Sequence, residues 1–585
     1  MIDKKKNQKK QNIYQLLLAL LILFLLNLIG YSVFTRFDLT SEKRYSLSDA
    51  TKNGLKELKD IVYFNVYLDG EFPAGFKRLR NETKEMLNQF RAYSDNIHYE
   101  FINPSEGSDK KKTQELYKQL IEKGLEPTNL QVKAAEGTKQ QIIFPGAIVS
   151  YRGKELPLQL LMSQMGTPPE AILNNSIQSL EYNISNVIRK LTVISKPKLA
   201  FLEGHGELDN YELADISSTL ADYYEVKRVR INHKLNSLNG LKIIVIAKPD
   251  SVFDEKDKFI IDQYIMKGGK VLWLIDPMNA SMDSLQKSAE TTGYSNPINL
   301  DDQLFKYGVR LNPNLIMDLN ALSIPVVTGK MGNQPQQSFL PWAFFPLLSP
   351  TIKHPIINNL NSIKSEFIST LDTINQKDIK KTILLTSSKY SRIANTPVAI
   401  NLNMLRKDPD ERMYNKSFLP VAVLLEGKFE SVFKNRVPPE ISEDKSIGFK
   451  ENCTANNKMI VISDGDIIKN QLQMSEGRLF PLPLGFDRYT RQQFGNKDFI
   501  LNCIDYLCDE SGLISVRSRE LKLRLLDKQK LNQSQNVFFK LISMPSRVVW
   551  QLLNVVFPLL LVIIFGFIRQ FYRKRKYSRK VIVKK

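Results

Sequence analysis

Two long apolar runs, one near each end, constrain this chain more than any other feature of its sequence. No charged residue lies between Gln11 and Thr35 or between Val548 and Ile568. Each run has the length that a helix needs to cross the hydrocarbon core of a bilayer, and the first lacks the small-residue cleavage site of a signal peptide. We therefore predict two transmembrane helices, residues 13–35 and residues 548–568, as anchors of the 585-residue chain.

The second run contains groups that a lone membrane helix would leave without partners. Pro558 removes a backbone donor near its centre, and Gln551 and Asn554 are polar. Neighbouring helices can satisfy such groups in hydrocarbon. We therefore predict that Gln551, Asn554 and Pro558 mark a helix face that contacts a membrane-embedded partner.

Basic residues crowd the outer flank of each run. The N-terminal tail, residues 1–12, and the C-terminal tail, residues 569–585, together supply more than half of the net charge of +21. The positive-inside rule places both tails in the cytoplasm and the body between the runs in the periplasm, on the inner membrane of a bacterium. The basic composition thus predicts contact with anionic membrane lipid and gives little support for nucleic-acid binding.

The body begins with residues 36–165, for which we predict a membrane-proximal arm and a thioredoxin-like domain. Ser48 is placed to cap a helix, and the segments that follow have a βαβαββ order. The first strand-to-helix turn reads LDGEFPAGF and has no cysteine, so a redox role is not expected. A helical connector, residues 166–196, follows this domain.

Residues 197–512 are predicted to form a second α/β domain. KLAFLEG, LKIIVIAKP and KVLWLIDP are near-continuous apolar runs that alternate with helical segments, which indicates a parallel sheet covered on both faces. FLPVAVLLEG and NKMIVISDGD are expected to add strands, and GKMGNQPQQ is predicted to be an exposed loop. The fold class is therefore α/β: a thioredoxin-like module and a parallel-sheet, glutamine-amidotransferase-like domain between two transmembrane helices.

A basic connector, residues 513–547, leads to the second apolar run. Its first half interleaves leucines with basic side chains, among them Arg517, Arg519 and Arg524. This pattern suits a partner surface or the anionic face of the membrane, and a solvated connector is the plain alternative.

The stretch FLEGHGELDNYEL is the strongest candidate for a functional loop. It follows the first strand of the second domain, and open α/β sheets bind ligands at such ends. His205 is a candidate general base flanked by Glu203 and Glu207, and the three are also candidate ligand-binding residues. We favour a structural turn built on the glycines over a ligand or metal site.

The remaining residues offer no nucleophile for that histidine. No G-x-S-x-G motif occurs, Cys453 lies in a polar stretch, and Cys503 and Cys508 lie in a helix-like one. Asp464 and Asp466 end a predicted strand, but two carboxylates alone are a weak metal site. No phosphate-binding loop for ATP exists. We predict no catalytic residue, metal or cofactor, and the chain is not expected to be an enzyme.

Several segments together resemble a known family. RFDLTSEKRYSLS, FLEGHGE, VISDGDI and above all GNKDFILNCIDYLCDESGLISVRSRELKLRLLDK are similar to the gliding-motility-associated GldG family of Bacteroidetes. The resemblance implies an auxiliary, so-called substrate-binding subunit of an ABC transporter. Its implied partners are a membrane permease subunit and a cytoplasmic ATPase subunit, and the implied role is gliding over surfaces.

Three classes of function stay open on the sequence. The first is a coupling subunit that links the permease and the ATPase to periplasmic motility or secretion components. The second is a periplasmic solute receptor, and the third is a degenerate amidotransferase-like hydrolase. Anchoring at both ends favours the first class, because a diffusing binding protein needs at most one tether.

Overall fold

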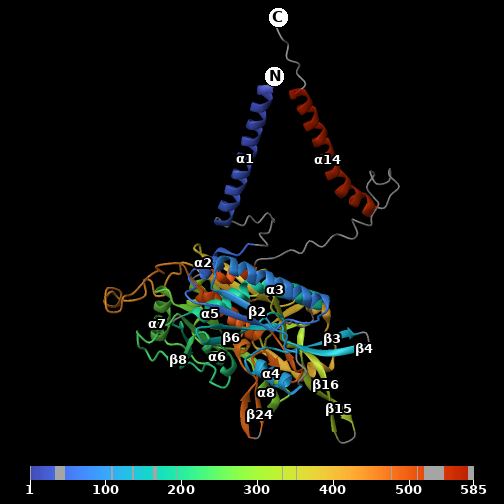
Figure 1. The fold of residues 1–585 in the computed structure, drawn as a ribbon. Helices are drawn as coiled ribbons and strands as arrows, with labels where there is room; N and C mark the ends of the chain where they lie inside the picture. The colour runs from blue at the N-terminus through green and yellow to red at the C-terminus, as the bar shows by residue number, and fades with distance from the viewer. Residues whose placement is uncertain are drawn as a thin grey trace. The chain divides into compact units, whose positions relative to one another are not determined.

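The computed structural model of the chain is shown in Figure 1. It describes residues 2–32, 46–106, 110–134, 137–162, 168–193, 195–331, 334–350, 352–475, 477–509, 512–518 and 546–577. The chain separates into two compact units, Met1–Glu520 and Leu521–Lys585. The first unit holds both α/β modules, and the second holds the C-terminal helix.

Both predicted spans fall on long helices. Helix α1 (Ile2–Ser32) contains the apolar stretch Ile13–Leu28, and α14 (Ser546–Tyr577) contains the stretch Asn554–Arg575. Among the described residues, only the stretch in α14 is both long and apolar enough to cross a membrane. Membrane association is therefore supported at the C-terminal end, and the two-span topology stays a prediction.

The first module contains helices and strands in the following order. They are α2 (Asp49–Lys56), β1 (Val62–Val66), α3 (Ala74–Tyr93), β2 (Ile97–Phe101), α4 (Lys110–Glu122), β3 (Thr128–Ala134), β4 (Gly137–Ile143), β5 (Gly146–Tyr151), β6 (Lys154–Gln159) and α5 (Pro169–Thr192). The main sheet has the strand order β2-β1-β5-β6, and β3 and β4 form a separate hairpin. Strands β1 and β2 are parallel, whereas β5 and β6 are antiparallel additions.

Helix α5 belongs to the core of this module. It lies within residues 166–196, which the sequence predicted as a connector, yet Leu180, Ile184 and Ile188 are buried together with the strands β1 and β5. The helix is long enough, at 24 residues, to bury a full apolar stripe against a sheet. This segment is thus a packing element as well as a link.

The second module is built on a large mixed sheet with the strand order β15-β16-β19-β22-β23-β10-β9-β7-β8. In chain order, these strands are β7 (Lys198–Glu203), β8 (Glu225–Arg230), β9 (Ile243–Ala247), β10 (Lys270–Leu274), β15 (Ala321–Met331), β16 (Gln334–Pro350), β19 (Ile379–Thr386), β22 (Pro420–Gly427) and β23 (Asn457–Ile462). Strands β8, β7, β9, β10 and β23 are parallel to one another. The others are antiparallel and extend the sheet beyond the parallel part that the sequence indicated.

Helices cover both faces of the parallel strands. They are α6 (Ala214–Ala221), α7 (Glu255–Met266), α9 (Asp301–Tyr307) and α11 (Asn496–Cys508). Alternate residues of β7 enter different cores: Phe201 packs in the core that contains α6 and α11, and Leu202 packs in the core that contains α7 and α9. Two buried faces explain why these strands are apolar at nearly every position.

The hairpin β15–β16 corrects one expectation from the sequence. GKMGNQPQQ was predicted to be a loop, but Gly329 to Met331 end β15 and Gln334 to Gln337 begin β16. The polar composition at the end of a long hairpin was mistaken for a longer loop. Figure 1 shows this hairpin projecting from the body on the same side as the hairpin of β24 (Leu472–Ser475) and β25 (Arg478–Pro481).

Shorter elements complete the second module. They are β11 (Met278–Asn279), α8 (Met282–Lys287), β12 (Glu290–Ser295), β13 (Val309–Leu311), β14 (Asn314–Asp318), β17 (Ile363–Lys364), β18 (Leu371–Thr373), β20 (Ser391–Asn395), β21 (Val398–Asn401), η1 (Leu402–Arg406), η2 (Glu411–Met413), α10 (Pro439–Ser442), η3 (Asp466–Ile468), β26 (Phe486–Asp487), β27 (Gln492–Gln493) and η4 (Leu513–Ser518).

Candidate functional site at the carboxyl ends of the parallel strands

Charged residues follow four of the parallel strands. Glu203 ends β7, Lys248 follows β9, Asp276 follows β10, and Asp464 follows β23. The carboxyl ends of parallel strands meet at one edge of a sheet, which is where open α/β folds place their ligands. This edge is therefore the candidate functional site.

An ion cluster of partly buried side chains joins three of these strand ends. The ammonium of Lys248 lies 2.5 Å from Oδ2 of Asp466 and 3.2 Å from Oδ2 of Asp276. The backbone N–H of Gly465 donates to Asp276 Oδ1 at 2.5 Å, and that of Asp466 donates to Asp464 Oδ1 at 2.7 Å. Lys248 has a φ of 54°, a left-handed conformation that is uncommon for residues other than glycine.

Burial and neighbouring charges together shift the pKa values of the groups in this cluster. Burial favours the neutral form of Lys248, but the carboxylates of Asp276 and Asp466 hold its pKa well above the usual range. Burial raises the pKa of Asp464 well above that of a free aspartate, and Asp276 raises it further. Burial likewise raises the pKa of Asp276, opposed by Lys248. The cluster thus holds a charged lysine beside Asp464, whose carboxyl group is driven toward its neutral form by burial.

Three carboxyl groups of this cluster also have the spacing of a metal site. One oxygen each from Asp276, Asp464 and Asp466 lies within 4.8 Å of the others. The sequence had singled out only the last two, because Asp276 lies far away along the chain. The ammonium of Lys248 already pairs with two of these three carboxyl groups, those of Asp276 and Asp466. We therefore interpret the cluster as an internal ion pair rather than as a set of metal ligands.

The histidine of FLEGHGELDNYEL is enclosed by carboxylates. His205 Nδ1 lies 3.3 Å from Glu207 Oε1, and His205 Nε2 lies 3.2 Å from Asp257 Oδ2. The ring stacks on Phe253 with a centroid distance of 3.7 Å. Burial would raise the pKa of Glu207, but hydrogen bonds from the side chain and backbone of His205 lower it below the usual value. Both ring nitrogens of this buried histidine face groups of its own chain.

The side chain of Glu203 binds a different partner from those of His205 and Glu207. Its carboxylate pairs with the guanidinium of Arg228 on β8, which also donates to the carbonyl of Leu208 at 2.7 Å. The structure therefore brings His205 and Glu207 together and engages Glu203 with the adjacent strand. Asp257 and Phe253, which the sequence did not suggest, complete the surroundings of the histidine.

The glycines of this loop fit it against the loop after β9. Gly206 has a φ of 76°, and a Cβ atom built there would lie 1.5 Å from Asp250 Oδ1. The carbonyl of His205 accepts hydrogen bonds from the backbone N–H groups of Asp250 and Ser251, both at 3.0 Å. Glycine at position 206 is thus required by both conformation and space.

A wide cleft opens beside the ion cluster, with a volume of about 1410 Å³. Glu366, Asp466 and Lys469 are among the charged residues that line it, and Lys469 pairs with Glu212 at 2.9 Å. Burial raises the pKa of the Glu366 carboxyl, opposed by Lys364. Apolar residues from α8, β15, β16 and η1 also line it: Leu285, Ile324, Val326, Leu340, Phe345 and Leu405.

None of the three cysteines lines this cleft in the described part of the chain. Cys453 and Cys503 are buried in the two cores of the second module, and Cys508 packs at the edge of one of them. Burial raises the pKa of the Cys503 thiol well above its usual value. A buried, protonated thiol is inert, so these side chains act as small apolar groups.

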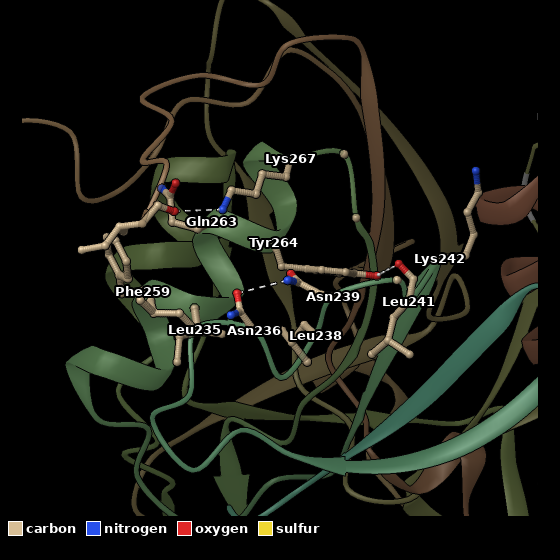
Figure 2. A pocket seen from close by; sticks show the side chains of 15 residues that line it. Leu235, Asn236, Leu238, Asn239, Leu241, Lys242, Phe259, Gln263, Tyr264 and Lys267 are labelled. Carbon is tan, nitrogen blue, oxygen red and sulfur yellow. Dashed lines mark hydrogen bonds between the residues drawn. The ribbon is translucent and has the colours of Figure 1, made fainter. Parts of the chain in front are cut away.

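A second pocket lies at the opposite, amino-terminal edge of the parallel strands (Figure 2). It holds about 220 Å³ between the segment before β9 and helix α7. Polar groups around it bond to one another, for example Asn239 Nδ2 to Asn236 Oδ1 at 3.1 Å and Tyr264 Oη to the Leu241 carbonyl at 3.4 Å (Figure 2). Its small size and internal bonding make it the weaker candidate.

The other residues that the sequence singled out lie apart from the cleft. Arg517 is in η4, where its guanidinium donates to the carbonyl of Asn358 at 3.1 Å and lies 5.3 Å from the ring of Tyr182. Gln551, Asn554 and Pro558 lie on α14. Arg519 and Arg524 lie outside the described residues.

The fold and the cleft define a class of protein: a two-module α/β protein with a ligand-sized cleft at the strand ends and a helix able to cross a membrane. The chain belongs to the family of auxiliary proteins described as an ABC-type uncharacterized transport system, which matches residues 196–503, just over half of its length. Membership gives the chain an accessory role in an ABC transport system and implies association with transporter components. Residues 41–150 match a domain of unknown function.

Two further comparisons identify proteins with a similar sequence or structure. An uncharacterized protein of Borreliella burgdorferi is 22% identical over 581 residues, which cover 97% of this chain and 99% of the relative. Among solved structures, the mmIFT52 N-terminal domain aligns with 53% of this chain and 96% of its own, at 11% identity and a TM-score of 0.29. That structural likeness is too low to support an argument.

Proposed function

We propose that this protein is a non-catalytic accessory subunit of an ABC transport system and that its second module binds a transport partner or cargo in the cleft beside Asp466. Family membership supports the accessory role. The observation that carries the binding role is the cleft of about 1410 Å³ at the carboxyl ends of the parallel strands. Pockets for small molecules usually hold about 300–1,000 Å³, so the volume favours a larger ligand.

The bonding of the polar groups supports a non-catalytic role. Catalysis by a histidine requires a ring nitrogen within reach of the substrate, and both nitrogens of His205 face Glu207 and Asp257. Lys248 is likewise held by Asp276 and Asp466. These ion pairs connect the loops that follow the parallel strands. The degenerate hydrolase is therefore the weakest of the three functional classes.

The finer parts of the proposal concern partners and place. The resemblance to the gliding-motility family leads us to propose a permease subunit and a cytoplasmic ATPase as partners, two membrane spans with both tails cytoplasmic, and a periplasmic body. The first module is proposed to be thioredoxin-like, supported by its β2-β1-β5-β6 order. The parallel strands of the second module support the proposed amidotransferase-like core. A periplasmic solute receptor is the alternative that the cleft also supports.

Filling the cleft tests the binding role. Leu405 on η1 and Leu340 on β16 are both half-buried and line it. The variants Leu405→Trp and Leu340→Trp should abolish the transport-dependent phenotype while the protein still copurifies with its permease. Val252→Trp is the matched control, because Val252 is 61% exposed and does not line the cleft. Full function in a folded, cleft-filled protein would contradict the proposal.

A further inference from the structure

We infer that the cleft takes an extended peptide segment of another protein, which adds as a strand to the free edge of β15. This inference rests on the proposed function and names the class of ligand.

Five successive residues of β15, Ile324 to Thr328, line the cleft. Successive side chains of a strand point to opposite faces of the sheet. A cavity against one face would touch every second residue. A cavity that touches five in a row must run along the edge of the strand, where the backbone itself is accessible.

Among the described residues, that edge has no partner strand: β15 is the terminal strand of the large sheet and pairs there with β16 alone. In the described part of the chain, no backbone hydrogen bond connects residues 322–328 to any other segment. Unpaired N–H and C=O groups along an edge are a template for an added strand, and the main-chain bonds supply the affinity in such complexes.

Two prolines fix which backbone groups point toward the cleft. Pro341 is the partner of Ser323, and Pro325 is the partner of Phe339. Opposed residues of antiparallel strands alternate between pairs that hydrogen-bond to each other and pairs whose backbone groups point away from each other. A proline has no N–H to donate, so both of these pairs are of the second kind. Val327 lies two residues after Pro325 in the same register, so its backbone groups also point away from β16. Ser323 and Val327 therefore offer N–H and C=O groups to the cleft, and Pro325 offers only its carbonyl.

The walls of the cleft limit what can reach this edge. Helix α8, η1 and the segment after η3 line the same cleft as β15, through Leu285, Leu405 and Gln471. An edge covered in this way admits a single extended segment more readily than a folded sheet. Pairing of β15 with β15 of a second copy is therefore the less suitable arrangement, and it is one outcome of the test.

The apolar walls also indicate the side chains of the peptide. Ile324 and Leu340 are paired on neighbouring strands and both line the cleft, and Val327, which also lines it, is 58% exposed. A bound strand would place alternate side chains next to these groups. The favoured ligand is thus an extended segment with apolar residues at alternate positions.

Photocrosslinking in the full-length protein tests the inference. A benzophenone amino acid replaces Thr328 in cells of the native host, and crosslinked peptides are identified by mass spectrometry. We expect crosslinks to one defined segment of a second protein. The same probe at Val252, which lies outside the cleft, is the background control.

Two variants of Val327 separate the backbone from the side chain. Val327→Pro removes the backbone N–H that Val327 offers to the cleft and should lower crosslinking at least tenfold. Val327→Thr keeps that N–H and the strand preference, and should stay within twofold of the wild type. Equal melting temperatures for the two variants are required, and equal crosslinking by both would overturn the strand-addition geometry.

The remaining outcomes distinguish this inference from the proposed function. Crosslinks to lipid or to a small solute would overturn the peptide while leaving a ligand-binding cleft in place. Crosslinks between two copies of the chain would replace the peptide with self-association. No crosslinking above the Val252 control overturns the inference, and retained function in the Leu405→Trp variant would overturn the cleft as a binding site.

Discussion

His205 and Asp257 are paired across the second module: Nε2 of the imidazole lies 3.2 Å from Oδ2 of the carboxylate. Asp257 lies in the first turn of α7, and His205 follows β7. The pair therefore joins a strand end to a helix start, with Glu207 on the other side of the ring. The FLEGHGELDNYEL loop, whose sequence most resembled an active site, thus connects β7 to α7.

We predict that His205→Ala lowers the free energy of unfolding by about 3 kcal/mol, because it removes the ring that pairs with the buried carboxylates of both Glu207 and Asp257. His233→Ala is the control: its side chain is 52% exposed and also contacts Asp257, and its loss should cost less than about 1 kcal/mol. Urea unfolding of the detergent-solubilised protein measures both. Equal effects of the two changes would contradict a structural role specific to His205.

Local features of this fold were predictable from the sequence. Ser48 was expected to cap a helix, and its side chain accepts a hydrogen bond from the backbone N–H of Thr51 at the start of α2. The apolar runs of β7, β9 and β10 were expected as strands and are found as such. The thioredoxin-like and amidotransferase-like assignments stay predictions, because sheet order alone does not establish a fold family.

The ion cluster was not predictable, because its members are far apart in the chain. Lys248 and Asp466 are separated by 218 positions and meet only because β9, β10 and β23 are neighbours. One signal was available: AKPD, LIDP and ISDGD each place charged residues directly after an apolar strand. Sequence reasoning also missed β15 and β16, because the polar stretch GKMGNQPQQ, which ends one strand and begins the next, was predicted to be an exposed loop.

Removing the cation of the cluster should destabilise the second module strongly. Lys248→Met leaves Asp276 and Asp466 facing each other, and we expect a loss of about 3 kcal/mol at neutral pH. Adding Asp466→Asn should recover a large part of this loss, because it removes one uncompensated charge. Lys469→Met, whose side chain is 37% exposed, should cost less than about 1 kcal/mol. Thermal melting of the three variants checks the order, and failure of the second change to rescue the first would argue against charge as the cause.

Glycine substitutions at two positions should have opposite effects. Gly206→Ala places a Cβ where Asp250 now lies, at a φ of 76°, and should destabilise the protein by several kcal/mol. Gly54→Ala meets nothing within 4 Å on helix α2 and should stabilise it by about 0.5–1 kcal/mol. Denaturant midpoints of both variants, at equal slope, provide the comparison. A tolerated alanine at position 206 would show that the loop can move away from Asp250.

His354 should make the protein less stable as the pH falls. Burial lowers the pKa of His354, and its Nδ1 accepts the backbone N–H of Ile356 at 3.3 Å, so the folded state favours the neutral ring. In the unfolded chain the ring titrates near pH 6.5. This contribution to stability is therefore present above about pH 6.5 and is lost as the pH falls through that value toward the folded pKa.

The matched variant is His354→Asn, whose side-chain oxygen can accept the same backbone N–H without titrating. Unfolding free energies of both proteins at pH 7.5, 6.5 and 5.5 give the difference that belongs to this residue, since the buried carboxyl groups titrate in both. We expect the wild type to lose stability relative to the variant on acidification. A constant difference across this range would show that His354 has the same pKa in both states.

Glu181 should control the docking of α2 on the first module. Its Oε1 accepts hydrogen bonds from the backbone N–H of Ser48 at 2.6 Å and from the hydroxyl of Thr51 at 3.0 Å. Glu181→Ala leaves both donors without that acceptor and should cost about 1–3 kcal/mol, whereas Glu181→Gln keeps an amide oxygen at the same place and should cost less. Hydrogen exchange of residues 47–58 is the direct measurement, because local release of α2 raises exchange there before the rest of the module opens. If both variants exchange like the wild type, packing of Leu47 and Leu55 in the core holds the helix without Glu181.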